Sequence, residues 1–100
     1  MNSSTRKLLT IITESALERI LVEEIERLGA CGFTITDARG KGRRGPRDAA
    51  WDESSNIRIE ILCDAEIADA IARHLQARYY DDYGMVLFVN DVSALRPEKF

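Results

Sequence analysis

A run of nine residues, 39–47, concentrates the side chains best suited to bind an anion. It holds five cationic residues and three glycines with no acidic residue among them, in the order Arg39, Gly40, Lys41, Gly42, Arg43, Arg44, Gly45, Pro46 and Arg47. Guanidinium groups hold phosphate or carboxylate oxygens through paired hydrogen bonds, and glycine lets the backbone approach a ligand closely. The run therefore predicts a site for a small polyanion.

This run is not a Walker A loop, and a second interpretation also fits its composition. The opening Gly40-Lys41-Gly42 lacks both the earlier glycine and the hydroxyl residue after lysine that a Walker A loop requires. A long loop rich in Gly, Arg and Asp is also typical of a solvated, mobile hairpin tip. The two interpretations agree if binding of a ligand orders the loop.

Few other residues point to chemistry. Trp51, the only tryptophan, follows the cationic run, and its place in a loop indicates a contact with a partner. The only histidine, His74, falls beside the apolar stripe of a predicted helix, where an edge-of-core or surface role is expected. Because no motif places a set of acid–base residues, we expect no enzyme activity, no metal and no other cofactor.

The composition is that of one ordinary globular domain over residues 1–100. The chain is 45% hydrophobic and 31% charged with a formal net charge of −3, which excludes disordered and disulfide-stapled classes. The acidic balance gives no general reason to expect nucleic-acid binding. No apolar run reaches the roughly 18–20 residues of a membrane span, and residues 1–5 lack the pattern of a signal peptide. We therefore expect a cytoplasmic protein that is not embedded in a membrane.

Hydrophobic spacing predicts a strand and then a helix in the first part of the chain. Residues 6–13 contain a short apolar run suited to a buried strand. Ser15 and Glu18 fit a capping box, and Gly29 supplies a stop signal. Between them, apolar residues recur at three- and four-residue steps, as expected for the core-facing side of a helix: Leu17, Ile20, Leu21, Ile25 and Leu28.

Two segments of alternating polarity, 33–36 and 57–61, predict strands on either side of a long loop at about 39–55. If the two strands form an antiparallel hairpin, residues whose numbers sum to about 94 face each other. Ile35 then lies opposite Ile59. The hairpin would hold both ends of the cationic loop close together.

The same register places Cys31 opposite Cys63. We expect both to be small buried thiols, because a reducing compartment disfavours disulfides. A redox-linked bridge between the two is the alternative.

A second helix and a last strand follow. Asp64 can cap a helix that ends near Tyr80, with an apolar stripe formed by Ile67, Ile71, Leu75 and Tyr79. Residues 85–89 are apolar at every position, which predicts a strand with both faces covered. The order strand, helix, strand, strand, helix, strand is that of the α+β ferredoxin-like sandwich, with both helices on one face of the sheet. The other face would then be open and partly apolar, which predicts self-association.

Two short motifs stand at fixed places in this order of elements. Gly40-Lys41-Gly42 opens the long loop and is followed by Arg44 and Arg47, and Asp82-Tyr83-Gly84 precedes the last strand. Together with the element order, these motifs resemble the PII-like signalling proteins, most of all the carboxysome- and bicarbonate-transport-associated branch. The likeness spans nearly the whole chain.

The resemblance implies a PII-like homotrimer that binds an adenine nucleotide, AMP or ADP, in clefts between subunits, with bicarbonate as a further ligand. It implies a non-catalytic sensor that signals the inorganic-carbon or energy state when its long loop, the T-loop of the family, becomes ordered. A bicarbonate transporter or a carboxysome-related protein is the implied partner. Residues 93–100 would form the C-terminal tail.

The resemblance also implies eight nucleotide-binding residues, matched by motif. Loop cations would hold the phosphates, loop glycines would let the backbone approach, the turn before the last strand would line the adenine side, and a tail arginine would reach in. These residues are, in that order, Lys41, Arg44 and Arg47, then Gly40 and Gly42, then Tyr83 and Gly84, and Arg96. The turn departs from the Gly-Asp-Gly-Lys sequence by which standard PII proteins bind ATP, which argues against sensing of ATP with 2-oxoglutarate.

The residues alone are also compatible with two other functions. A ferredoxin-like module can bind RNA or DNA through a basic loop, but such modules usually stack bases on aromatic residues of an exposed sheet face, and the first and third strands have none. A small acyl-phosphate hydrolase would need a positioned amide to orient water. Asn56 and Asn90 are its internal candidates, and neither lies in a recognisable motif.

Overall fold

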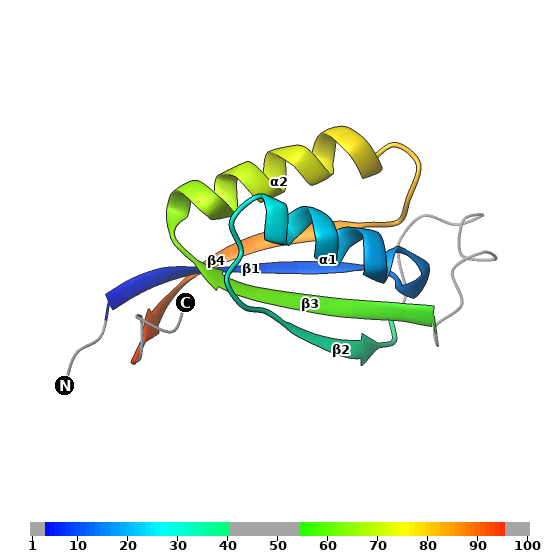
Figure 1. The fold of residues 1–100 in the computed structure, drawn as a ribbon. Coiled ribbons are helices and arrows are strands. Elements are labelled where there is room, and N and C mark those ends of the chain that lie inside the picture. Colours follow the sequence, from blue (N-terminus) through cyan, green and yellow to red (C-terminus); the bar gives the residue numbers. More distant parts are fainter. Residues whose placement is uncertain (1–3, 41–54, 96–100) are drawn as a thin grey trace.

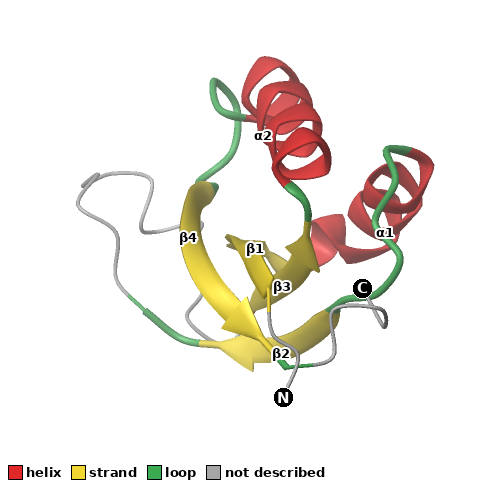
Figure 2. Cartoon of the chain, turned by 90° about the vertical axis from the view of Figure 1, so that its left-hand side faces the viewer, coloured by secondary structure: helices red, strands yellow, loops and turns green. Residues whose placement is uncertain are grey.

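A computed structural model describes residues 4–40 and 55–95, in which four antiparallel strands form one sheet in the order β2-β3-β1-β4. Both helices pack on the same face of this sheet (Figures 1 and 2). This confirms the predicted ferredoxin-like sandwich. Neither helix in the described ranges combines the length and apolarity of a membrane span. The elements are β1 (Ser4–Glu14), the 3-10 helix η1 (Ser15–Leu17), α1 (Glu18–Arg27), β2 (Thr34–Ala38), β3 (Asn56–Cys63), α2 (Ala65–Tyr79) and β4 (Val86–Ala94).

The predicted hairpin register is confirmed in β2 and β3. Ile35 pairs with Ile59, as the sum of 94 requires, and the ladder ends with Ala38 opposite Asn56. The loop that joins these strands therefore starts and ends on directly paired residues. Most of it, residues 41–54, lies outside the described part of the chain.

The core lies between the sheet and the two helices. Alternate residues of the central strands β1 and β3 point toward the helices, and the pairing of Leu9 with Ile61 and of Ile11 with Ile59 stacks their side chains. Fully burying each such side chain contributes about 1.5–3 kcal/mol. The core residues that are 0% exposed are Leu9, Ile11, Leu21, Ile25, Ile59, Ile61, Ile71 and Leu75.

The start of the first helix differs from the prediction. Ser15 lies inside η1 rather than at the cap position before α1, and no side-chain hydrogen bond caps either element, so the predicted capping box with Glu18 is wrong. Ile20 is 42% exposed, whereas Glu24 is only 6% exposed. The buried side of α1 is therefore rotated toward Glu24, which lies between the two helices.

The second helix agrees with its prediction. The Asp64 side chain caps α2 by accepting a hydrogen bond from the Ile67 N–H at 2.9 Å. Ile71, Leu75 and Tyr79 are buried and Ile67 is half-buried. The apolar stripe faces the core as its spacing requires.

Strand β4 leaves part of its apolar surface uncovered. Phe88 pairs with Thr10 and Val86 with Ile12, on the sheet face that points away from the helices. Phe88 is 40% exposed and Val86 46% exposed, so the expected coverage of both strand faces is not met within one chain. The strand also continues to Ala94, which includes the first two residues of the predicted tail.

The two cysteines are free thiols in different surroundings. Cys63 is buried, as expected, but Cys31 is exposed. Because β2 begins only at Thr34, the hairpin register does not extend to Cys31. Burial, followed by the nearby charge of Asp64, raises the pKa of the Cys63 thiol, against a smaller opposing effect of Arg6.

Gly29 ends the first helix in a conformation that only glycine adopts readily. Its φ is +115°, and a Cβ there would lie 3.3 Å from Ile67 Cγ1. We expect Gly29→Ala to lower the free energy of unfolding by about 1–3 kcal/mol because of backbone strain. Urea denaturation measures this change. Gly32→Ala is the matched control, since its Cβ would meet no atom within 4 Å, and equal effects of the two substitutions would contradict the explanation.

Candidate functional site

Three of the predicted nucleotide-binding residues belong to the described part of the chain. They are Gly40, at the start of the long loop, and Tyr83 and Gly84, in the turn between α2 and β4. The geometry of the candidate site is therefore that of the loop base and of this turn. The other predicted nucleotide contacts and the predicted partner contact lie outside the described residues, namely Lys41, Gly42, Arg44, Arg47, Arg96 and Trp51.

A row of residues across one end of the sheet connects the loop base to the turn. Ala38, two residues before Gly40, pairs with Asn56, and Asn56 pairs with Glu14 at the end of β1. Glu14 Oε1 accepts a hydrogen bond from the Gly84 N–H at 3.3 Å. Figure 1 shows the same arrangement, with the end of β2, the start of β3 and the α2–β4 connection at one end of the sheet. The structure thus brings Gly40 and Gly84 to a common end of the fold.

The turn between α2 and β4 is held by the last turn of the helix. The backbone N–H groups of Asp82 and Tyr83 both donate to the carbonyl oxygen of Tyr79, at 3.2 and 2.9 Å. The Tyr83 ring meets the Tyr79 ring edge to face with centroids 5.6 Å apart, and Tyr83 is 37% exposed. An exposed aromatic ring on a fixed turn offers a surface on which a planar base can stack.

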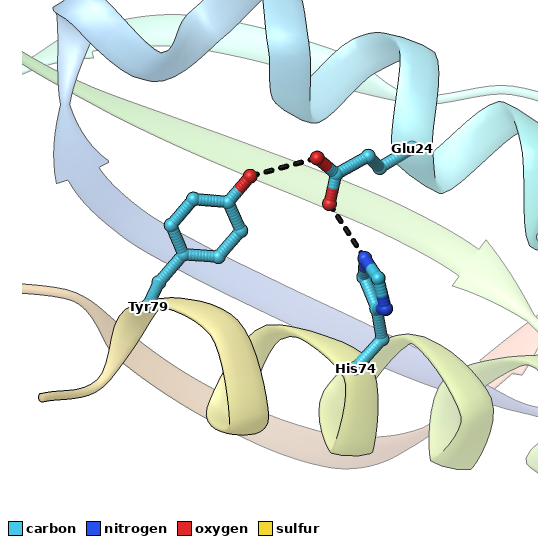
Figure 3. Close-up of polar contacts among 3 residues, drawn as sticks. All are labelled: Glu24, His74 and Tyr79. Carbon is cyan, nitrogen blue, oxygen red and sulfur yellow. Dashed lines mark hydrogen bonds and ion pairs between the residues drawn. The ribbon is translucent and has the colours of Figure 1, made fainter.

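Three polar side chains connect the two helices next to this turn (Figure 3). Glu24 Oε2 on α1 accepts a hydrogen bond from the Tyr79 hydroxyl at 2.7 Å, and Glu24 Oε1 lies 2.6 Å from His74 Nε2, both partners being on α2. The His74 side chain is 22% exposed, in agreement with the predicted edge-of-core role. Tyr79 thus links the interhelix contact to the turn that carries Tyr83.

The ionisation of Glu24 and Tyr79 reflects their contact. Burial acts to raise the pKa of Glu24, but the hydrogen bonds from Tyr79 and His74 and the electrostatic influence of His74 and Arg78 outweigh it, so this pKa is lowered. Burial, and then the hydrogen bond to Glu24, raises the pKa of Tyr79 to about 12. The pair therefore favours a charged carboxylate that accepts from a neutral phenol.

The opposite end of the sheet carries the end of β4. Ala94 pairs with Ser4, at the beginning of β1. Strand β4 has nine residues, and a strand rises about 3.3 Å per residue, so Leu95 lies roughly 30 Å from the α2–β4 turn. Within one chain, the tail and the turn start at opposite ends of the sheet.

Comparison with known proteins decides the family. The model of the family described as Nitrogen regulatory protein P-II matches residues 6–99. The chain belongs to the P-II family. This family consists of regulatory proteins, and the match includes the loop base, the turn and the row of residues between them.

Solved structures share the P-II fold of this chain. A structure described as that of a PII-like signalling protein from Thermus thermophilus is 46% identical, with 100% of this chain and 99% of that chain covered and a TM-score of 0.84. CPII, a nitrogen regulatory PII-like protein from Thiomonas intermedia, bound to ADP, AMP and bicarbonate, is 27% identical, covers 99% and 96%, and has a TM-score of 0.83. CPII bound to ADP and bicarbonate is 28% identical, with 99% and 97% covered and a TM-score of 0.83.

Two carboxylates of this P-II chain are missed by the sequence patterns. Glu14 lies two residues after Ile12 of β1. The pairing of β1 with β4, in which Ile12 lies opposite Val86, brings Glu14 to Gly84, and no pattern in the sequence near Glu14 indicates this contact. Glu24 lies three residues after Leu21 and four before Leu28, on the buried side of α1. Its position on an apolar stripe is a signal in the sequence, but a glutamate there is easily assigned to the solvated side.

The lowered pKa of Glu24 predicts a pH-dependent contribution to stability. Its carboxylate stabilises the fold above the ordinary pKa of 4.5, and this contribution is lost as the pH falls through the lower folded value. We expect the free energy of unfolding to fall more steeply below about pH 4.5 in the unmodified chain than in Glu24→Gln. Urea denaturation at a series of pH values measures both slopes. Glu26→Gln, exposed on the same helix, should keep the unmodified slope, and identical slopes for all three chains would disprove the role of Glu24.

Proposed function

We propose that this P-II protein is a non-catalytic sensor that binds an adenine nucleotide, AMP or ADP, at clefts between subunits. The observation that carries the proposal is the row Ala38, Asn56, Glu14 and Gly84, which joins the aromatic turn to the base of the cationic loop. A nucleotide needs both parts, because its base is planar and its phosphates are anionic. CPII, which is bound to ADP, AMP and bicarbonate, supports the same ligand class.

The loop cations are proposed to bind the phosphates. Lys41, Arg44 and Arg47 follow Gly40 within seven positions, and the position of Gly40 at the same end of the sheet as the turn supports this role for them. A Cβ at Gly40 would meet no atom of the described chain within 4 Å, so internal packing does not require glycine there and Gly40 leaves room for a ligand. Gly42 is proposed to act in the same way.

Ordering of the loop by the ligand is energetically feasible. Hydrogen bonds to charged groups contribute about 1.5–3 kcal/mol each. Fixing the backbone of one residue costs about 1–2 kcal/mol. Two or three phosphate contacts therefore offset the ordering of a few loop residues, which would allow the T-loop to signal that the nucleotide is bound.

The clefts are proposed to form in a homotrimer. Leu95 lies roughly 30 Å from the α2–β4 turn, and Arg96 is only one Cα–Cα step of about 3.8 Å further along the chain. Arg96 can therefore complete the site only from a neighbouring subunit. The open sheet face with Phe88 and Val86 supplies the apolar surface that such an assembly would bury.

We also propose bicarbonate as a second ligand and a protein as the partner of the loop. The CPII structures bound to bicarbonate support a role in sensing inorganic carbon. A bicarbonate transporter or a carboxysome-related protein, as in the branch that the sequence resembles, is the proposed partner, with Trp51 as a contact. Nucleic-acid binding is not favoured, because the central strands β1 and β3 contain no aromatic residue for base stacking.

Removal of a loop arginine tests nucleotide binding. We expect Arg44→Ala or Arg47→Ala to weaken AMP and ADP binding by about tenfold or more, because each deletes a charge-assisted phosphate contact. Calorimetric titration measures the affinities, with and without bicarbonate. Arg73→Ala is the control, since Arg73 is exposed on α2 and pairs with Asp69 at 2.8 Å. A lack of binding of AMP and ADP by the unmodified chain would overturn the proposal.

A charge on the open sheet face tests the trimer. We expect Phe88→Asp to dissociate an assembly of three 11.3 kDa chains, because the open face would then bury an unpaired carboxylate. Sedimentation velocity gives the mass. Ile20→Asp is the matched control, since Ile20 is 42% exposed and Phe88 40% exposed, and it lies on α1. Loss of the trimer in both variants, or in neither, would contradict the assigned interface.

A further inference from the structure

The open sheet face, which points away from both helices (Figure 2), has charged residues on β3 and apolar residues on β4. Two neighbouring rows cross this face, each starting at a charged residue of β3, passing through β1 and ending at an exposed apolar residue of β4. The rows are Arg58, Ile12 and Val86, and Glu60, Thr10 and Phe88. Strands β3 and β4 lie two strand spacings apart, about 10 Å. A partner that covers the apolar residues of β4 therefore also approaches the charges of β3.

Arg58 and Glu60 form an ion pair within one chain. Arg58 Nη2 lies 3.0 Å from Glu60 Oε2, and the two side chains are 45% and 35% exposed. Because the residues are two apart on β3, both belong to the open face. An ion pair that is this exposed adds little to the stability of a folded chain, since water already solvates both charges. The stability of a single chain therefore gives little reason for the pair.

The charges of the open face indicate which partner fits it. Within the described strands, the charged residues at positions on this face are two arginines and two glutamates, namely Arg6, Glu14, Arg58 and Glu60. Their formal charges sum to zero. A strongly acidic or basic partner finds no net opposite charge here, whereas a neutral face with apolar residues suits a second copy of the same chain.

Association of identical chains makes the charge balance within each chain decisive. Every copy brings the same residues to the interface, so a net charge on one open face meets the same charge on the next. Covering the face also removes water from Arg58 and Glu60, and an ion that loses its water without a partner is costly to bury. A pair that is already neutral within its own strand avoids both penalties.

We propose that the Arg58–Glu60 pair is a charge-balancing element of the surface on which further copies of this chain dock. This inference rests on the proposed homotrimer and assigns residues that control its assembly. Association then requires both charges or neither. Loss of one charge leaves the other unpaired in every subunit, whereas replacement of a buried ion pair by two neutral groups is often harmless.

Sedimentation equilibrium of the full chain tests this assignment with Arg58→Gln, Glu60→Gln and the double variant. Each single substitution should weaken association by at least about tenfold, because a charge at the interface loses its partner. The double substitution should restore most of the lost affinity. The matched control is an exposed ion pair on α2, in which Arg73 Nε lies 2.8 Å from Asp69 Oδ2. Arg73→Gln and Asp69→Asn should leave association unchanged.

A mixture of the two single variants separates charge balance from a local structural defect. Arg58→Gln leaves a net negative open face and Glu60→Gln a net positive one. An equimolar mixture should therefore associate more tightly than either variant alone, because opposite charges then meet across the interface. Thermal melting of each chain shows that it is folded.

Three outcomes would overturn the assignment. If both single variants associate as tightly as the unmodified chain, the pair does not lie between copies. If the double variant associates no better than the single ones, or the mixture gains nothing, charge balance is not the cause. A monomeric unmodified chain would refute the proposed homotrimer and the assignment with it, whereas a trimer that fails the other comparisons would refute the assignment alone.

Discussion

The pairing of β3 with both β1 and β2 is the constraint on which the site geometry depends. Ile57, Ile59 and Ile61 of β3 are at most 1% exposed, and a slip of one residue would turn all three onto the opposite face of the sheet. Hydrophobic burial thus fixes the register. The same register sets Asn56 between Ala38 and Glu14, so the apolar core determines where the polar end of the sheet stands.

Two carboxylates, the half-buried Glu14 and the buried Glu24, then connect the sheet to the rest of the molecule. Glu14 attaches the end of β1 to the backbone of the α2–β4 turn, and Glu24 attaches α1 to Tyr79 at the end of α2. Both contacts converge on the segment that carries Tyr83. The proposed binding site requires that its ligand meet a surface of fixed geometry, and these contacts hold the turn in place.

The sequence predicts the parts of this structure that follow from simple periodicity. Alternation in 33–36 and 57–61 is enough to obtain the register of Ile35 with Ile59, and Asp64 before an apolar stripe is enough to place α2. The contacts that the sequence does not predict are those of residues whose partners are distant in the chain. Glu24 meets a partner 55 residues away and Glu14 one 70 residues away, and no local pattern contains that information. The predicted capping box at Ser15 is wrong for a different reason, because the chain enters α1 through a 3-10 turn.

The pairing of β1 with β4 joins segments from the two ends of the described chain, with Ser4 opposite Ala94. Contacts at such large separations slow folding, because loop closure precedes the gain from pairing. During synthesis, β1 can pair with β3 well before β4 leaves the ribosome. Until then the side of β1 that β4 later covers is an unpaired edge flanked by apolar residues, the kind of edge that invites aggregation. Docking of β4 covers this edge of the central strand β1 and makes β4 the edge of the sheet, so cellular yield should depend on how quickly β4 docks.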